Sequence, residues 1–147
     1  MKRKLIALGI VVILCAAAYC IDLLIAAQYT LEVIAQTPEG EIPANGGTDE
    51  NGQPYAVTLT LRLTKNDVPV ANTNIRAVKT GYGSLDAINK RTDEDGCVQF
   101  IYTPYKTSIF RKNEDVPIEF IEDSHSLIIN VYVKIEYVIR MEGVDRG

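Results

Sequence analysis

The start of this chain constrains its structure more than any other part, because three cations precede a long apolar run. Lys2, Arg3 and Lys4 stand directly before residues 5–27, in which Asp22 is the single charged side chain. A helix rises about 1.5 Å per residue, so a run of this length crosses a hydrocarbon layer about 30 Å thick. The rest of the chain is patterned like β-strands. We therefore predict a β domain that a transmembrane signal anchor holds at a membrane.

The charges around the run predict its orientation. Cations favour the cytoplasmic side of a membrane span, and here they precede the run, whereas Glu32, Glu39 and Glu41 follow it. We expect a single-pass protein of the bacterial cytoplasmic membrane, with its N-terminus inside and residues 28–147 outside the cytoplasm. Asp22 lies five residues before the end of the run, where its carboxylate reaches the outer interface or pairs with a partner helix.

Two processing events are alternatives to a retained anchor. Residues 5–14 have the length of a signal-peptide hydrophobic region, and the alanines at 16–18 supply small residues for cleavage, which would leave a secreted domain. The apolar run continues through residues 21–25, which favours the anchor. Lipidation at Cys20 is a third reading, although Tyr19 stands where a bacterial lipobox has a small residue.

Composition limits the remainder of the chain to one domain. Subtracting the 27 residues of the tether from 147 leaves 120, enough for one hydrophobic core. These residues carry 12 Lys and Arg (15 minus 3) and 18 Asp and Glu (19 minus 1), a net charge of −6. This balance argues against binding to nucleic acid or docking on anionic lipid, and it favours solubility or a basic partner.

Cysteine usage excludes a disulfide inside the domain. Cys15 and Cys20 fall within the apolar run, which leaves Cys97 alone in the domain. We expect Cys97 to be a half-buried small hydrophobic residue, with intermolecular pairing as the alternative. The stability of the domain must therefore come from packing.

Alternation of apolar and polar residues predicts two long strands. In residues 55–64, every second residue from Tyr55 to Leu63 is apolar, and threonines and Arg62 lie among the intervening residues. A period of two with one polar face is typical of a half-buried strand. Residues 127–139 alternate in the same way over 13 positions, which is long for one strand and predicts a bulge or bend.

Shorter apolar runs predict further strands between clusters of Gly, Pro, Asn and Asp. These runs are residues 29–35, 74–78, 97–102 and 117–121. Strands at this spacing, with no helical period after residue 27, predict a β-sandwich. Residues 37–54 are rich in Pro and Gly and are expected to form a long polar loop or linker.

The turns between these strands resemble those of a known family. Residues 57–64 lead through 65–75, which contain Val68-Pro69-Val70, to a second strand, and residues 92–100 read Thr-Asp-Glu-Asp-Gly before a third. This pattern resembles the bacterial Ig-like domains of group 1, known from invasins and intimins. The resemblance covers residues 55–105 by motif, and 106–140 by strand pattern. It implies an all-β, Ig-like antiparallel β-sandwich.

The chemistry of these turns gives their residues architectural roles. Asp95-Gly96 permits a positive φ at low cost, Asp93 can bond to the backbone two residues on, and Pro69 fixes φ after the first turn. Because no Gly precedes Val68-Pro69, Asn66 or Asp67 must accept the left-handed conformation.

The sequence offers few groups for catalysis. His125 is the only histidine, so it supplies neither a metal cluster nor a triad by itself, and we expect it in an exposed turn. The chain has no Gly-rich phosphate loop, no Cys or His pair at metal spacing and no nucleophile elbow. Turn formation explains the three carboxylates of residues 93–95, for which calcium is the alternative. We expect a protein that is not an enzyme and needs no cofactor or metal.

Aromatic residues near the predicted loops are the candidate contact residues. They are Tyr82, Tyr102, Tyr105 and Phe110. Exposed tyrosines stack on sugars or anchor protein interfaces, and packing in the core or at an edge is the alternative for all four. The strand at 127–139 could also pair with a neighbouring chain, which its charged residues discourage.

Together these features predict an anchored module with four parts. Residues 1–27 form the basic tip and transmembrane helix, 28–54 the first strand and linker, 55–141 the Ig-like sandwich and 142–147 a tail. We expect a structural or interaction module of the bacterial cell surface or envelope, which contacts a protein partner or a second copy in adhesion. A carbohydrate- or cell-wall-binding module that contacts a surface glycan is one alternative. A subunit of a surface filament or envelope assembly is the other.

Overall fold

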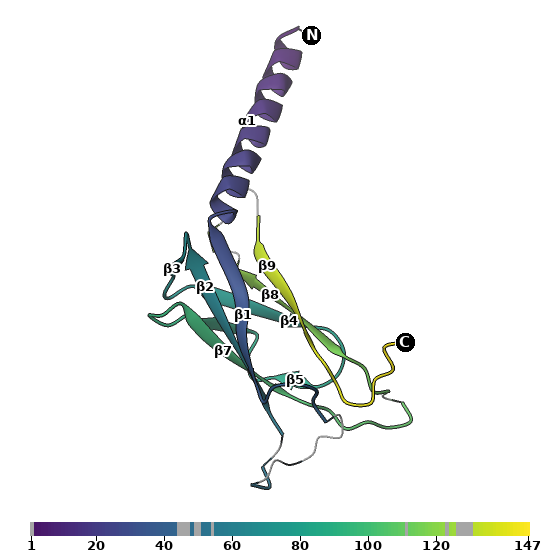
Figure 1. Ribbon diagram of the computed structural model, residues 1–147. Helices are drawn as coiled ribbons and strands as arrows, with labels where there is room; N and C mark the ends of the chain where they lie inside the picture. The colour runs from purple at the N-terminus through teal and green to yellow at the C-terminus, as the bar shows by residue number, and fades with distance from the viewer. Residues whose placement is uncertain are drawn as a thin grey trace.

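The structure of the protein is a computed structural model that describes residues 2–43, 48, 51–53, 55–110, 112–122, 124–125 and 131–147. In these ranges a long helix is followed by two antiparallel sheets (Figure 1). The helix α1 spans Lys2–Ala26, and the strands are β1 Tyr29–Thr37, β2 Val57–Lys65, β3 Val68–Pro69, β4 Asn74–Lys79, β5 Ser84–Leu85, β6 Asn89–Arg91, β7 Cys97–Thr103, β8 Val116–Glu122 and β9 Val133–Ile139.

The helix α1 projects from one end of the sheets (Figure 1). Most of its described large apolar side chains are exposed. Its segment Ile6–Ala26 is long and apolar enough to cross a membrane, by length and composition. Leu8, Ile13 and Leu24 are 64, 69 and 68% exposed. The predicted N-terminal apolar helix is therefore confirmed, and it is compatible with a signal anchor or a signal sequence.

The end of α1 nearest the sheets departs from this pattern. Ala18 is 9% exposed and Asp22 only 1%, and Asp22 takes part in an interaction with its surroundings. The sequence predicted that this carboxylate would reach the membrane interface or a partner helix. Instead it is buried within its own chain.

The strands form two sheets, and the hydrophobic core lies between them. One sheet has the order β1-β2-β7-β5, with β3 also paired to β2, and the other has the order β6-β4-β8-β9. All strand pairs within these sheets are antiparallel. This arrangement confirms the predicted antiparallel β-sandwich behind one helix.

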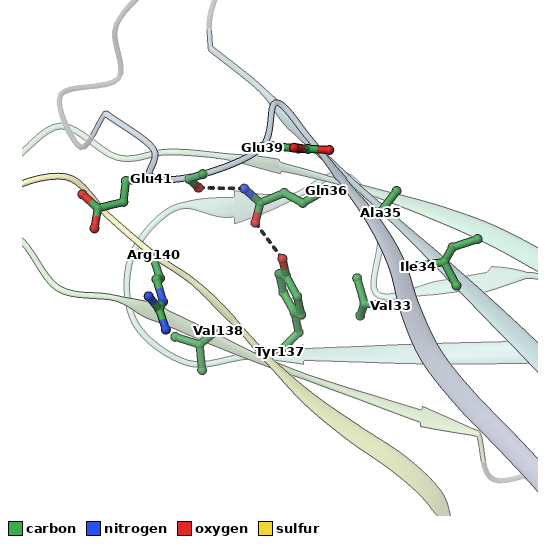
Figure 2. Close-up of a pocket in the computed structure, with 10 residues that line it drawn as sticks. Val33, Ile34, Ala35, Gln36, Glu39, Glu41, Tyr137, Val138 and Arg140 are labelled. Carbon is green, nitrogen blue, oxygen red and sulfur yellow. Dashed lines mark hydrogen bonds between the residues drawn. The ribbon is translucent and has the colours of Figure 1, made fainter.

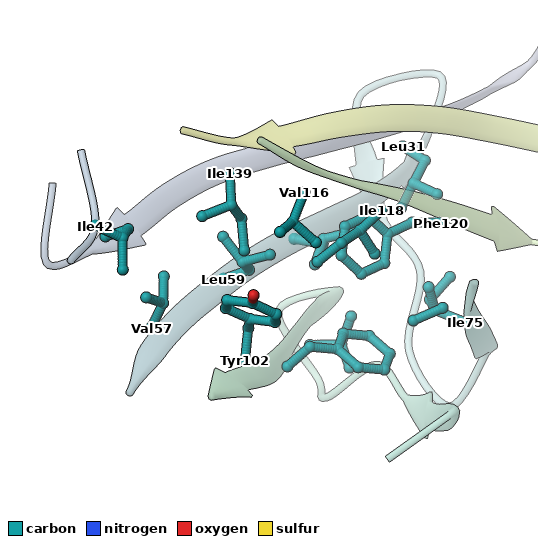
Figure 3. Close-up of a cluster of buried hydrophobic side chains, with 14 of the residues drawn as sticks. Leu31, Ile42, Val57, Leu59, Ile75, Tyr102, Val116, Ile118, Phe120 and Ile139 are labelled. Carbon is teal, nitrogen blue, oxygen red and sulfur yellow. The ribbon is translucent and has the colours of Figure 1, made fainter. Parts of the chain in front are cut away.

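The core lies between the two sheets and follows the alternation of the sequence (Figure 3). Leu59 and Leu61 of β2 are fully buried, as are Phe100 of β7 and Phe120 of β8. The two phenylalanine rings meet across the sheets with centroids 5.3 Å apart. Such aromatic pairs contribute about 0.5–1.5 kcal/mol beyond the burial of their area.

The chain crosses from the first sheet to the second after β1. Beyond Thr37 and Pro38, the fully buried Ile42 forms a parallel bridge with Met141. The Ile42 amide donates to the Arg140 carbonyl at 2.9 Å, and the Glu142 amide donates to the Ile42 carbonyl at 2.9 Å. One end of the sandwich is thereby closed by the stretch expected to be only loop.

The predicted strands agree with the observed ones to within a few residues. The runs at 29–35, 55–64, 74–78, 97–102 and 117–121 correspond to β1, β2, β4, β7 and β8. The strand predicted at 127–139 is observed from Val133, and residues 126–130 lie outside the described residues. The short strands β3, β5 and β6 were not predicted, because two or three residues carry no periodic signal.

Candidate interaction site

The candidate aromatic residues converge at the end of the domain away from α1. Tyr82 follows β4, whereas Tyr105 and Phe110 lie in the connection between β7 and β8. The rings of Tyr82 and Tyr105 are 5.1 Å apart, and the Tyr82 hydroxyl donates to the Phe110 carbonyl at 3.5 Å. The Tyr102 hydroxyl donates to the Tyr82 carbonyl at 3.3 Å.

Two of these four residues are buried and two are exposed. Tyr102 is fully buried and Tyr105 is 5% exposed, whereas Tyr82 and Phe110 are 37 and 85% exposed. Tyr102 and Tyr105 therefore cannot offer the contact surface considered for them, and the packing alternative describes them. Burial also raises the pKa of Tyr102 well above its usual range, so its hydroxyl stays protonated and can donate.

Tyr105 orders the loop that carries Phe110. Its hydroxyl donates to the Lys112 carbonyl at 3.1 Å and accepts from the Glu114 amide at 3.0 Å. The loop is thus fixed to the body of the domain behind its apex. At the apex, Ile109 is 89% exposed beside Phe110. We call Ile109 and Phe110 the apical pair.

A groove of about 620 Å³ lies between β1 and β9 (Figure 2). Its walls combine apolar side chains, such as Val33 and Val138, with Glu39 and Arg140. It lies where β1 and β9, one edge strand from each sheet, face each other. Because the lining is mixed, the groove offers no single ligand chemistry.

Gln36 connects the two walls of this groove (Figure 2). Its Oε1 accepts a hydrogen bond from the Tyr137 hydroxyl at 3.0 Å, and its Nε2 donates to the carbonyls of Pro38 and Gly40 at 2.9 and 3.0 Å. A single amide therefore links β1, the turn that follows it and β9. No sequence pattern indicates this role, since Gln36 and Tyr137 lie 101 residues apart.

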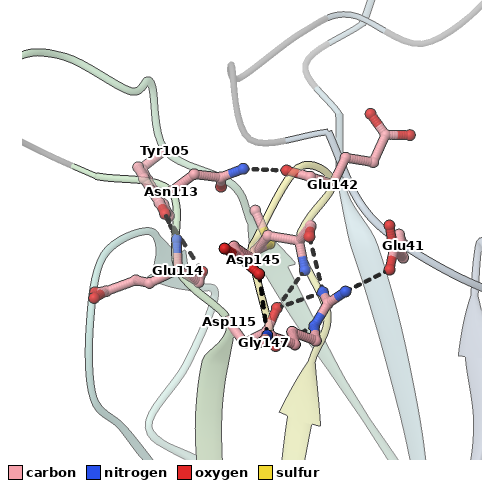
Figure 4. Close-up of polar contacts among 10 residues, drawn as sticks. Glu41, Tyr105, Asn113, Glu114, Asp115, Glu142, Asp145 and Gly147 are labelled. Atoms are coloured by element: carbon pink, nitrogen blue, oxygen red, sulfur yellow. Dashed lines mark hydrogen bonds and ion pairs between the residues drawn. The ribbon is translucent and has the colours of Figure 1, made fainter.

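A carboxylate and a guanidinium secure the closed end of the sandwich (Figure 4). Arg146 Nε donates to Asp115 Oδ2 at 2.7 Å and Arg146 Nη1 to Glu41 at 2.6 Å. Asp115 also accepts from the Met141 amide at 2.9 Å. The hydrogen bond from Arg146 lowers the pKa of Asp115 to about 2. The C-terminal residues are thereby held against the bridge between Ile42 and Met141.

Among the described residues near α1, Glu122, Ser124 and His125 form a polar cluster. Glu122 is 1% exposed, and its Oε1 contacts both Ser124 Oγ and, at 2.9 Å, His125 Nδ1. Ser124 Oγ also lies 3.5 Å from His125 Nδ1, the same ring nitrogen that contacts Glu122, whereas in a Ser-His-acid triad the serine and the carboxylate contact opposite ring nitrogens. His125 stacks on Tyr29, the first residue of β1, with centroids 4.2 Å apart. The cluster ties the loop after β8 to the strand that follows the helix.

The two turns that resemble those of the Ig-like family depend on a few residues with unusual backbone conformations. Asn66 and Asp67 both adopt positive φ, 49° and 66°, between β2 and β3, and Pro69 pairs with Thr64 in the resulting hairpin. This is the mirror-image turn that matches the twist of hairpin strands. At this first turn, both of the residues considered for the left-handed conformation adopt it.

The second turn depends on Asp93 and Gly96. Asp93 Oδ1 accepts from the amides of Asp95 and Cys97 at 3.0 and 2.8 Å. A Cβ on Gly96, whose φ is 72°, would lie 2.5 Å from the Leu63 carbonyl oxygen. Cys97 is half-buried, and burial raises its thiol pKa. Asp93 thus serves the turn, and among the described residues no three His, Cys, Asp or Glu side chains are placed to hold a metal ion.

Comparisons with known proteins give a structural likeness and no sequence match. No protein-family model and no curated protein sequence matches the chain. Among solved structures, the D00-D0 domain of intimin is similar with a TM-score of 0.52 and 18% identity, covering 77% of this chain and 47% of that one. The D0-D1 domain of intimin gives a TM-score of 0.49 at 20% identity, with 76 and 49% of the two chains covered.

A third similar structure is a C-terminal 282-residue fragment of intimin in complex with the intimin-binding domain of the translocated intimin receptor. Its TM-score is 0.48 at 20% identity, with 73 and 32% of the two chains covered. The chain spans about half the length of the intimin D00-D0 structure. The fold is therefore an Ig-like β-sandwich of the kind found in intimin, and the resemblance seen in the turns is confirmed at the level of the fold.

Proposed function

We propose that this chain is a membrane-anchored extracytoplasmic interaction module of the bacterial cell surface or envelope, and that it is not an enzyme. The observation that carries the proposal is the direct connection between an exposed apolar helix and an Ig-like sandwich: α1 ends at Ala26 and β1 begins at Tyr29. Residues 1–27 act as the tether, and the sandwich presents its loops and edges to a partner.

The surface chemistry supports contact over catalysis. The carboxylates with strong polar partners stabilise the architecture: Asp115 holds the C-terminal residues, and Asp93 shapes a turn. Exposed apolar residues line α1, and among the described residues of the domain Ile109 and Phe110 have the largest exposed fractions of the large apolar side chains. A tether at one end and an apolar apex at the other suit a module that holds two surfaces together.

The first test is the mass and topology of the mature protein in membranes. An intact chain of 16.3 kDa supports the anchor, whereas loss of about 18 or 27 residues, as signal cleavage gives, contradicts it. Protease added to spheroplasts should digest a C-terminal tag and spare an N-terminal one. The matched control replaces Lys2, Arg3 and Lys4 by Glu, which should weaken this orientation.

Carbohydrate or cell-wall binding is a second candidate, favoured by the exposure of Tyr82 and Phe110 at one end of the domain. Aromatic faces stack on sugar rings. Binding to peptidoglycan or to a glycan array that disappears in both Tyr82→Ala and Phe110→Ala would favour this candidate. Binding no stronger than background in the unmodified chain would exclude it.

A further inference from the structure

The apical pair is the most exposed apolar feature of the domain. Ile109 and Phe110 are consecutive and are 89 and 85% exposed. Single exposed apolar residues are common on soluble proteins, but an adjacent pair of this size at the apex of a loop requires explanation. The residues that precede the pair, Thr107 and Ser108, are exposed and polar. Within its loop the pair therefore follows polar residues, and Tyr82 lies beside Phe110.

The loop holds this pair outward in an ordered arrangement. The buried Tyr105 binds the backbone of Lys112 and Glu114 behind the apex. On the other side of the pair, the Phe110 amide donates to Ser108 Oγ at 3.3 Å. Tyr105 fills the space of this loop next to the core, and Ile109 and Phe110 remain outside it. The exposure of the pair is therefore built into the fold.

Cations flank the apical pair on both sides. Lys106 and Lys112 are exposed, Glu114 in the same loop is also exposed, and the carboxylate of Asp115 is paired with Arg146. Two lysines therefore stand against one exposed carboxylate, that of Glu114, beside the pair. The domain as a whole is acidic, but charges beyond about 8 Å are largely screened at physiological salt. A surface meeting the apex therefore senses the lysines before it senses the net charge of the domain.

We propose that the apical pair inserts into an anionic lipid bilayer that faces the one spanned by α1. A protruding apolar pair between cations suits the interfacial layer of a membrane, where the apolar groups enter the acyl boundary and the lysines meet lipid phosphates. A protein partner would instead need a socket shaped for the pair. The apex and α1 lie at opposite ends of the domain (Figure 1). The chain thus bridges two bilayers.

This inference names a partner for the proposed module and rests on that proposal, but its test does not depend on processing in the cell. The full chain is placed in nanodiscs of neutral phosphatidylcholine, so that α1 already occupies a bilayer. Vesicles with about one-third phosphatidylglycerol, or of phosphatidylcholine alone, are then added and separated by flotation. The nanodiscs should float with the anionic vesicles and remain behind with the neutral ones.

Insertion can be read directly because the chain has no tryptophan. The emission of Phe110→Trp should shift to the blue on addition of anionic vesicles and be quenched by brominated acyl chains. The matched reporter is Ile88→Trp, since Ile88 is 65% exposed outside the loop. Its emission should not change. An unchanged emission of Phe110→Trp overturns the proposal, as does an equal response of both reporters.

Variants then separate the apolar and electrostatic contributions. Ile109→Ser with Phe110→Ser should weaken vesicle binding by at least about 10-fold, whereas Ile88→Ser should leave it unchanged. Lys106→Glu with Lys112→Glu should also reduce binding by about 10-fold or more and remove much of its salt dependence. Capture of a protein or glycan that depends on the apical pair, without flotation of the nanodiscs, would overturn the bilayer as partner. Cleavage of α1 in the cell would contradict the anchor and leave the nanodisc result unaffected.

Discussion

Two edge strands of the sandwich, β1 of one sheet and β9 of the other, end their sheets in different ways. The register of β1 against β2 shifts between Val33 and Ala35, so Ile34 is an extra residue on that edge. The pairing of β9 with β8 is regular from Val133 to Ile139. Bulges protect exposed edges from pairing with other strands. β1 is therefore protected by its shape, and β9 by the charges of Lys134 and Glu136.

Removing one core side chain beneath β9 should change the free energy of unfolding more than the other substitutions proposed below. Phe120 lies on β8 and pairs with Ile135 of β9, so Phe120→Ala leaves a cavity behind that edge and should lower the free energy of unfolding by about 3–5 kcal/mol. Chemical denaturation measures the loss. Phe110→Ala is the same chemical change at an 85% exposed position and should cost less than about 0.5 kcal/mol. Equal losses would contradict the core described here.

The stability of the closed end of the sandwich should depend on pH through the carboxylate of Asp115. Its carboxylate pKa is about 2, lowered from 3.8 mainly by the hydrogen bond from Arg146. The stabilisation is therefore fully present above about pH 4 and is lost as the pH falls through about 2. Asp115→Asn should cost about 1–2 kcal/mol at pH 7 and should flatten the pH dependence between pH 4 and 2. An unchanged profile in the variant would assign that dependence to other groups.

The hydrogen bond between Tyr137 of β9 and Gln36 of β1 should contribute less to the free energy of unfolding. Tyr137→Phe removes the hydroxyl that donates to Gln36 Oε1 and should cost about 1 kcal/mol. Amide exchange should rise on both walls of the groove, whereas Tyr132→Phe, at a 44% exposed tyrosine just before β9, should leave exchange near β1 unchanged. Faster exchange in β9 alone would mean that the amide of Gln36 does not couple the strands.

Deleting Ile34 should have the smallest effect on stability, and it tests directly whether the bulge protects the edge of β1. The deletion keeps the pairs on both sides of the bulge and removes a side chain that is 48% exposed, so stability should change by less than about 1 kcal/mol. With a regular edge, β1 should favour self-association, which sedimentation in detergent would detect. Substitution of Ile34 by Ser retains the bulge and should leave the chain as it was. If the deletion variant does not associate more than this control, the bulge does not protect the edge.

Sequence patterns predicted the parts of this fold that depend on neighbours in the chain. Alternation identified β2, because one face of it is buried, and a short apolar run between turn residues identified β7. The turn at Asn66 and Asp67 was foreseen because no glycine was available to take the positive φ. These features depend on periodicity and local backbone energy, which a single sequence contains.

The parts that were missed depend on contacts between distant segments. Ile42 stands alone in a polar stretch, and its burial requires Met141, 99 positions later (141 minus 42). Tyr105 was a candidate contact residue because it lies in a loop, yet its hydroxyl is used by the backbone of the same loop. Only the folded chain shows which aromatic residues of a loop face inward.

The short distance along the chain between α1 and β1 has a mechanical consequence. Only Ala27 and Gln28 separate them, so tension applied through α1 enters the sandwich along the axis of β1. The antiparallel pairs from Tyr29–Lys65 to Thr37–Thr58 would then be loaded together in shear, not opened one after another. A module tethered in this way resists pulling with a whole strand of hydrogen bonds at once.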